Sequence, residues 1–310
     1  MLKKTLVTLG SWALGILGVA AIVWYFQPRD FGETLAAIGW SGVAGWVLLT
    51  LLSRVCAAEA TVEPLTTLGY KMTRPDAFWI SWIRTFVNQI LPLAGVAAYA
   101  HMVRRRTGIP WSQLAALGQP QLLLAAAAIG LVGLVATAVN IERLQASGLG
   151  LLFMYGGIVL LSLAFASGAH WLMELLPKSL AQRASNTTDA LRKIARKKNL
   201  IVRLSLFHVA AVLLRGGRVW FLFAAAGFSL DWAELLLVLA IAESALLLNV
   251  TPGGLGIREG ALLGGAALLG IEAPVAASVA LIDRLFMLAI TTLLAAPAFV
   301  VLRKPHSASG

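Results

Sequence analysis

The stretch Asn249-Val-Thr-Pro-Gly-Gly-Leu-Gly-Ile-Arg-Glu-Gly260 interrupts an otherwise apolar segment that runs from Trp232 to Gly270. Glycines strip side chains from the backbone, so peptide N–H groups are available and a ligand can approach closely. Arg258 and Glu259 follow where the next helix should begin, and a helix N-terminus beside a guanidinium suits a phosphate. The predicted anion-binding turn comprises Asn249, Gly253, Gly254, Gly256, Arg258 and Glu259. The alternative is a glycine hinge that only lets helices pack closely.

The composition around this stretch is that of an all-α integral membrane protein. Hydrophobic residues make up 59% of the 310 residues and charged residues 13%, whereas a soluble domain carries about 25% charged residues. Mean hydropathy is +0.83. Open strands cannot span lipid, so the apolar segments are predicted to be helices. The single cysteine, Cys56, excludes an intrachain disulfide.

Eight apolar segments follow one another along the chain. They are Leu6–Phe26, Leu35–Ala58, Asp76–Met102, Trp111–Val139, Gly148–Leu176, Leu204–Phe228, Trp232–Gly270 and Pro274–Leu302. The first follows Met1-Leu-Lys-Lys, as in a signal peptide, but it is longer than a normal signal-peptide core and is predicted to remain as a span. We predict a single transmembrane domain, 1–310, with two halves, 35–139 and 204–302, joined by a basic cytoplasmic segment, 177–203.

The distribution of lysine and arginine predicts the orientation. With the N- and C-termini in the cytoplasm, 17 of the 25 basic residues fall inside and only Arg29 and Arg143 fall outside, in accord with the positive-inside rule. This placement in loops also argues against nucleic acid as the reason for the net charge of +11.

Two broken segments should enter the membrane from opposite sides. Residues 76–102 have basic residues on both flanks and a break at Asn88–Gly95, so this segment is predicted to be a re-entrant hairpin. Residues 232–270 have external flanks and longer arms, so both a re-entrant hairpin and two full spans stay open. Each break places a glycine seven residues after an asparagine, with a proline between. Such matching breaks predict an inverted repeat, which is typical of transporter sites.

Six arginines and three acids fall within the apolar segments. They are Arg54, Arg84, Arg215, Arg218, Arg258 and Arg284, with Glu243, Glu259 and Asp283. Ionisable groups at this depth are costly and mark functional sites, so the excess of arginine predicts an anionic substrate. Arg84, Asn88, Arg215 and Arg218 join the predicted substrate-binding residues. Glu243, Asp283, Arg284 and Arg54 are predicted to be coupling or charge-pair residues, with snorkelling to the interface as the alternative for Arg54.

The chain resembles the flippase-like transmembrane domain of lysylphosphatidylglycerol synthases, in a form without the synthase domain. The resemblance covers essentially the whole chain and is carried by Asn88–Gly95 and by Pro252-Gly-Gly-Leu-Gly-Ile-Arg-Glu-Gly260. In that family the first motif often continues with an acid and an arginine, whereas Val96-Ala-Ala-Tyr99 stands here. The resemblance implies lipid translocation between the leaflets of a bacterial or archaeal cytoplasmic membrane.

No enzyme chemistry is indicated. The four histidines lack metal-ligand spacing, and neither a nucleophile elbow nor a phosphate-binding loop occurs. We therefore expect no catalytic residues, metal or cofactor. The predicted function is a flippase for an anionic or phosphate-bearing lipid, either a phospholipid or an aminoacyl-phospholipid. The alternatives are a transporter of polyprenyl phosphate or its glycosylated form, and a non-catalytic membrane partner of a lipid synthase or glycosyltransferase.

Overall fold

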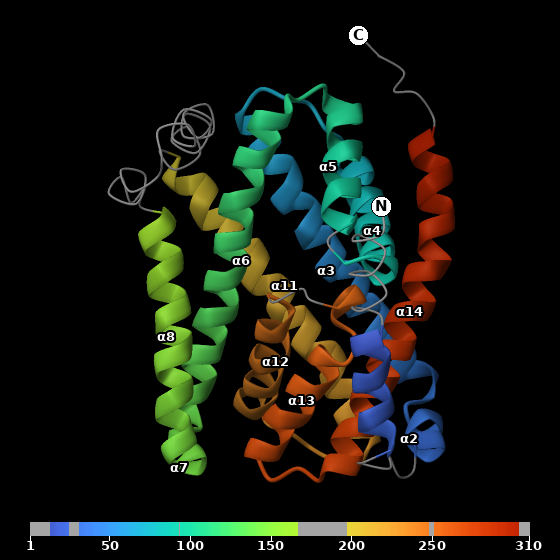
Figure 1. Ribbon diagram of the computed structural model, residues 1–310, viewed down its shortest axis with the longest axis vertical. Coiled ribbons are helices and arrows are strands. Elements are labelled where there is room, and N and C mark those ends of the chain that lie inside the picture. The colour runs from blue at the N-terminus through green and yellow to red at the C-terminus, as the bar shows by residue number, and fades with distance from the viewer. Residues whose placement is uncertain (1–12, 25–30, 93, 167–196, 248–250, 304–310) are drawn as a thin grey trace.

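A computed structural model describes residues 13–24, 31–92, 94–166, 197–247 and 251–303. Throughout these ranges the regular elements are helices, without strands (Figure 1). A first helix, Ala13–Trp24, precedes the elements that Figure 1 labels. Those elements are α2 (Phe31–Ala37), α3 (Gly39–Thr67), α4 (Arg74–Ile90), α5 (Ala94–Thr107), α6 (Trp111–Val139), α7 (Ile141–Leu144), α8 (Ala146–Ala166), α11 (Lys198–Ala225), α12 (Trp232–Leu246), η1 (Pro252–Gly254), α13 (Ile257–Leu268) and α14 (Ala273–Arg303). The prediction of an all-α membrane protein is confirmed.

Four of these helices are long and apolar enough to cross a membrane: α3, α6, α11 and α14. The predicted bounds of α6 agree with the structure, but α3 continues to Thr67 instead of ending at Ala58. Glu59 and Glu63, which mark a polar end in the sequence, lie inside the helix and form ion pairs with Arg74 and Arg203. Arg54 consequently lies in the middle of α3. The rest of the predicted span 6–26, residues 167–176 of the predicted span 148–176 and residues 177–196 of the basic segment lie outside the described residues.

The pairs α4–α5 and α12–α13 are helical hairpins that enter from opposite ends of the molecule (Figure 1). Each begins at a side-chain cap: Thr73 accepts from the N–H of Asp76, and Asp231 accepts from the N–H of Glu234. The arms contain 17, 14, 15 and 12 residues. At 1.5 Å per residue each is shorter than a hydrocarbon core of about 30 Å. Arms of this length favour a re-entrant arrangement for both pairs, and for residues 232–270 this stays a prediction.

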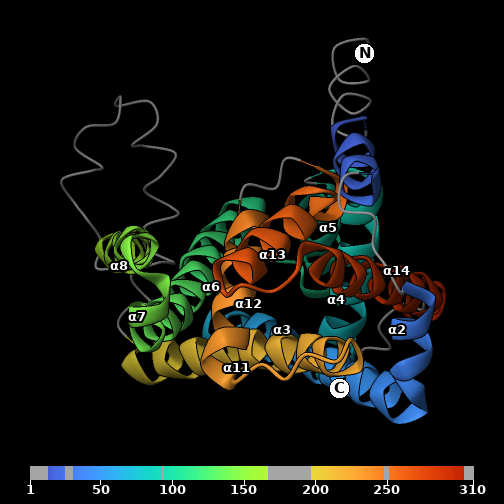
Figure 2. The same ribbon diagram turned by 90° about the horizontal axis from the view of Figure 1, so that it is seen from below.

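The tips of the two hairpins meet inside the bundle. α4 contacts η1, and a Cβ built on Gly253 would lie 3.1 Å from Cγ of Gln89. The halves also pack crosswise, with α4 against α14 and α12 against α6, while α3 lies beside α11 (Figure 2). The order of long helix, hairpin and long helix thus occurs twice with opposite direction. It supports the predicted inverted repeat, which stays a prediction.

The first helix lies at the periphery, against the second hairpin (Figure 2). A Cβ built on Gly15 would lie 3.0 Å from Leu255, and one on Gly18 would lie 3.1 Å from Cα of Gly256. Two glycines one turn apart thus let this helix approach the turn before α13 closely, as small residues do between membrane helices.

The orientation can be tested by labelling. The 68–73 and 108–110 connections, which Lys71, Arg74 and Arg104–Arg106 belong to or adjoin, lie at the upper end of Figure 1, and the 226–231 and 269–272 connections lie at the lower end. In a Cys56→Ser background, we expect Lys71→Cys and Arg105→Cys to react from the cytoplasmic side of sealed vesicles. Ser229→Cys and Glu272→Cys should react from the other side. Reaction of the first two from opposite sides would contradict the first hairpin.

Candidate functional site

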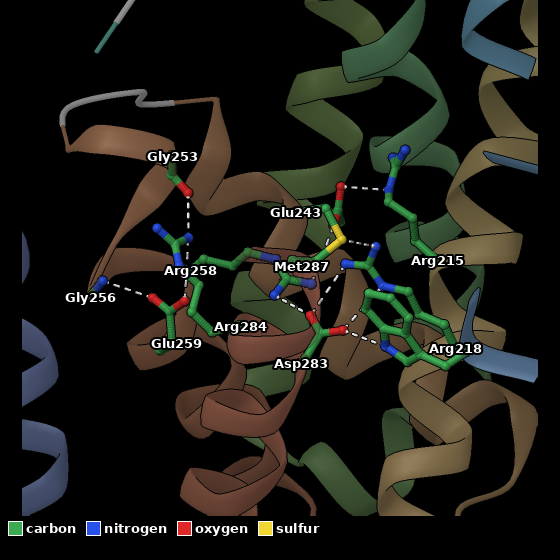
Figure 3. A network of polar contacts seen from close by, with 11 residues as sticks. Arg215, Arg218, Glu243, Gly253, Gly256, Arg258, Glu259, Asp283, Arg284 and Met287 are labelled. Carbon is green, nitrogen blue, oxygen red and sulfur yellow. Dashed lines mark hydrogen bonds and ion pairs between the residues drawn. The ribbon is translucent and has the colours of Figure 1, made fainter. Parts of the chain in front are cut away.

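Asp283, near the middle of α14, is the centre of a buried polar network (Figure 3). Its side chain is 0% exposed. Oδ2 accepts from Nη1 of Arg258 at 2.7 Å and from Nη2 of Arg218 at 3.2 Å, and Oδ1 accepts from Nε1 of Trp46 at 2.9 Å. Arg218 also lies over the Trp46 ring, 5.3 Å from its centroid. This one carboxylate therefore joins α3, α11, α13 and α14.

Glu243 of α12 is shared between two arginines. Its Oε2 lies 2.9 Å from Nε of Arg215, and its Oε1 lies 3.8 Å from Nη2 of Arg258. Glu243 is buried, whereas the Arg215 side chain is 27% exposed. In Figure 3 the terminal nitrogens of Arg215 point away from both Glu243 and Asp283. Arg215 thus contacts Glu243 through Nε, and its terminal nitrogens point away from the network.

Arg284 holds the tip of the second hairpin. Its Nη1 donates to the carbonyl of Gly253 at 2.7 Å and its Nη2 donates to that of Pro252 at 3.3 Å. Oε1 of Glu259 lies 3.7 Å from Nη1 of Arg284, and Oε2 accepts from the N–H of Gly256 at 2.7 Å. Glu259 therefore caps α13 and faces Arg284, while its neighbour Arg258 faces Asp283 (Figure 3).

Within the described residues, the three acids contact four of the six intramembrane arginines. We call Arg218, Arg258, Arg284, Glu243, Glu259 and Asp283 the paired network. No described carboxylate lies within ion-pair distance of Arg54 or Arg84. Among the described intramembrane arginines, Arg54 and Arg84 are therefore the two without a carboxylate partner.

Arg54, Arg84 and Arg215 form what we call the positive group. Burial of Arg54, and then the charges of Arg218, Arg215 and Arg84 in that order, disfavour its positive charge, whereas Glu243 favours it. Its guanidinium carbon lies 5.0 Å from the centroid of the Trp82 ring, and its Nε is buried without a hydrogen-bond partner. Like charges at this depth repel strongly unless an anion lies between them.

Arg84 is the accessible member of the positive group. It lies on the exposed side of α4, with its guanidinium carbon 5.3 Å from the centroid of the Tyr99 ring. The Tyr99 hydroxyl donates to Thr61 at 3.2 Å. An aromatic face thus holds Arg84, as another holds Arg54, without neutralising either charge.

Some of the predicted site residues belong to the paired network, and the others lie elsewhere. Asn88 lies near the tip of α4, and Gly253 packs against its neighbour Gln89. Asn249 lies outside the described residues. Gly253, Gly254 and Gly256 have φ of 56°, 73° and 79°, so the turn requires glycine conformations. Arg258, predicted to face a ligand, has a side chain 7% exposed and is occupied by Asp283.

Sequence reasoning missed the aromatic partners Trp46, Trp82 and Tyr99. Arg54 follows Trp46 by eight residues on one helix, but this spacing does not signal the contacts, since Arg54 lies on Trp82 of another helix and Arg218 lies on Trp46. The sequence signal that could have indicated these contacts is a tryptophan in an apolar segment that also contains arginines without acidic partners. No group of three His, Cys, Asp or Glu placed to hold a metal ion occurs in the part of the chain that the structure describes.

Two opposed helical hairpins around buried arginines, together with four helices long and apolar enough to cross a membrane, are the architecture of a multi-pass membrane protein. The family model described as "Lysylphosphatidylglycerol synthase TM region" matches residues 12–295. The chain therefore belongs to this family, and the expected resemblance is confirmed. The family corresponds to the non-catalytic membrane part of that synthase. No curated protein was found to match the chain.

Proposed function

We propose that this protein moves an anionic, phosphate-bearing lipid headgroup between membrane leaflets while the hydrocarbon chains remain in lipid. The observation that carries the proposal is the positive group, in which Arg54 and Arg84 lack a carboxylate partner among the described residues. An unneutralised arginine inside a bilayer is costly, and a substrate anion would offset that cost. The predicted substrate-binding role of Arg258 and the glycine turn belongs to the same proposal.

In this proposal the two hairpins provide the route that the lipid headgroup follows across the membrane. Their tips meet at Gln89 and Gly253, and each leads to a different end of the molecule (Figure 1). In this proposal the headgroup passes from one hairpin to the other where the two tips meet. Discontinuous helices that meet inside the membrane are how secondary transporters place such sites. The proposed location is a bacterial or archaeal cytoplasmic membrane, with both termini and the basic end inside.

Two other functions remain as alternatives. Transport of polyprenyl phosphate or its glycosylated form uses the same phosphate chemistry and differs only in the chain. A non-catalytic partner of a lipid synthase or glycosyltransferase needs no intramembrane charge excess, so the positive group favours transport.

The test is headgroup translocation in proteoliposomes. Acyl-labelled fluorescent phosphatidic acid, phosphatidylglycerol and phosphatidylcholine are followed with a reductant that cannot cross the bilayer. We expect the wild-type protein to speed translocation of the anionic lipids over phosphatidylcholine. Arg215→Gln should slow it roughly 10-fold or more, because a charge-assisted contact contributes about 1.5–3 kcal/mol. Arg104→Gln, an exposed arginine over Trp111 near the cytoplasmic end of α5, is the matched control and should keep the wild-type rate.

Two results of this experiment would overturn parts of the proposal. Anionic lipids that cross no faster than in protein-free vesicles, with the protein shown to be folded, would remove translocation as the function. A wild-type rate in the folded Arg215→Gln protein would remove the positive group as its site.

A further inference from the structure

A cavity of about 210 Å³ lies between the end of α5 and the end of α14, and it shares no residue with the paired network or the positive group. Its basic and polar lining comprises His101, Arg105 and Arg106 of α5 and Arg303 of α14, and its apolar lining includes Phe299 and Leu302. Both helices end at the upper end of Figure 1, beside the loops predicted to be cytoplasmic. The cavity therefore combines positive charge with an apolar wall at the level expected for the headgroups of one leaflet.

The walls of this cavity are held in place by contacts between three helices. α4 packs against both α5 and α14, and Phe86 of α4 meets Phe299 edge to face, with ring centroids 6.5 Å apart. Arg106 has a side chain only 9% exposed, and its Nη2 lies 3.6 Å from Oδ1 of Asp76. The same Nη2 donates to the carbonyl of Val301 at 3.3 Å. Arg106 is thus a fixed, largely buried cation that joins α4, α5 and α14 beside the cavity.

The other two arginines of the cavity are not neutralised within the described chain. Arg105 and Arg303 are exposed, and no described carboxylate lies within ion-pair distance of either. Arginines are expected in the last turn of a helix because they complement the helix dipole. Arg104, in the same turn, lies instead over Trp111 at 4.9 Å from the ring centroid and does not line the cavity. Two guanidinium groups from different helices that line one cavity suit the oxygens of one phosphate.

The size and surroundings of the cavity indicate a lipid as the source of that phosphate. The cavity is smaller than the pockets of about 300–1,000 Å³ that hold drug-sized molecules, so it holds a headgroup and not a whole lipid. Leu293 and Val300, seven residues apart on α14, are both exposed and provide apolar surface for hydrocarbon chains. Val300 and Arg303 are three residues apart and share one face of the helix. This apolar strip therefore leads to the charged lining of the cavity.

We propose that the cavity between α5 and α14 binds the phosphate headgroup of an anionic phospholipid from the cytoplasmic leaflet. Arg105 and Arg303 contact the phosphate from two helices, and the hydrocarbon chains lie along the outer face of α14. Basic pockets between membrane helices at the cytoplasmic side recognise anionic headgroups in this way. Such a lipid links the first hairpin to α14, and it binds whether or not the protein also moves lipid between leaflets.

The test measures lipid binding by native mass spectrometry of the full chain in detergent, with dioleoyl phosphatidylglycerol and dioleoyl phosphatidylcholine as probes. We expect the wild-type protein to bind phosphatidylglycerol more tightly. In the double variant Arg105→Gln with Arg303→Gln, one bound phosphatidylglycerol should lose affinity roughly 10- to 30-fold, because each arginine near an anionic lipid contributes a factor of roughly five. Both arginines are exposed, so this variant is expected to fold.

Arg104→Gln is the matched control, because it removes the same charge from the same turn of α5 without touching the cavity. It should keep the wild-type affinity for phosphatidylglycerol. Equal affinity of the wild-type protein for the two lipids would overturn the inference, as would unchanged binding of phosphatidylglycerol in the folded double variant. An equal loss in Arg104→Gln would overturn it in favour of a general attraction of anionic lipid to this end of the molecule.

Two further measurements exclude other sources of the bound lipid signal. Inorganic phosphate should compete only weakly, and displacement of phosphatidylglycerol by phosphate at equal affinity would overturn the lipid site in favour of a free-phosphate site. Arg215→Gln, which changes the proposed transport site, should keep the phosphatidylglycerol that the double variant releases. Loss of that lipid in Arg215→Gln, with retention in the double variant, would overturn the inference and assign the lipid to the transport site.

Discussion

Asp283→Asn is expected to lower the free energy of unfolding by about 3–5 kcal/mol, the cost of leaving a buried ion pair half broken. Asp283 is fully buried and accepts from Arg218, Arg258 and Trp46. The amide keeps the shape but loses the negative charge and presents N–H groups to two guanidinium groups. Four helices meet at this residue, so the loss should affect the whole bundle.

The measurement is thermal unfolding in detergent, in which the fraction of protein that remains monodisperse is recorded against temperature. Glu142→Gln, at an exposed acid of α7, is the control and should change stability by less than about 0.5 kcal/mol. Asp283→Asn combined with Arg218→Gln should be less destabilised than the sum of the two single variants, because one unpaired charge is removed. Wild-type stability of Asp283→Asn would show that the paired network does not hold the bundle.

Gly256→Leu is the second substitution expected to have a large effect. It distinguishes a packing role of Gly256 from a role in ligand binding. Gly256 has φ of 79° and lies against the first helix, where a Cβ would be 3.1 Å from the carbonyl oxygen of Gly15 and from Cα of Gly18. The left-handed conformation costs a side chain about 1–2 kcal/mol, and overpacking adds about 1–3 kcal/mol. We expect a loss of about 2–5 kcal/mol of unfolding free energy, together with loss of translocation.

Gly260→Leu is the matched control, one turn further along α13, because nothing lies within 4 Å of a Cβ at Gly260. It should fold and translocate as the wild type does. Unfolding and translocation that fail together in Gly256→Leu support a packing role for this glycine. A Gly256→Leu protein with full stability and no translocation would instead point to direct contact between the turn and the headgroup. Full stability with full translocation would contradict both roles.

The two breaks in helix could be predicted because their causes are local. Pro252 and the glycines after it disfavour a continuous helix, and Pro92 and Gly95 do the same within Asn88–Gly95. The positions of α4–α5 and α12–α13 relative to the two ends followed from the loop charges, because this bias acts on short segments. The end of α3 did not follow, since hydropathy falls at Glu59 and Glu63 but the helix continues through them to Thr67.

The partners of the charged residues were decided by tertiary structure. The sequence by itself determined a helical membrane protein, its two breaks and an excess of three intramembrane arginines. It did not determine which arginines carry that excess: Arg258, beside the glycine turn, is taken by Asp283, whereas Arg54 and Arg84 lie against aromatic rings. Hydropathy and charge counts are sums along the chain, but an ion pair depends on a distance of a few ångströms between helices. Only the packing of α3, α4, α11 and α14 sets those distances.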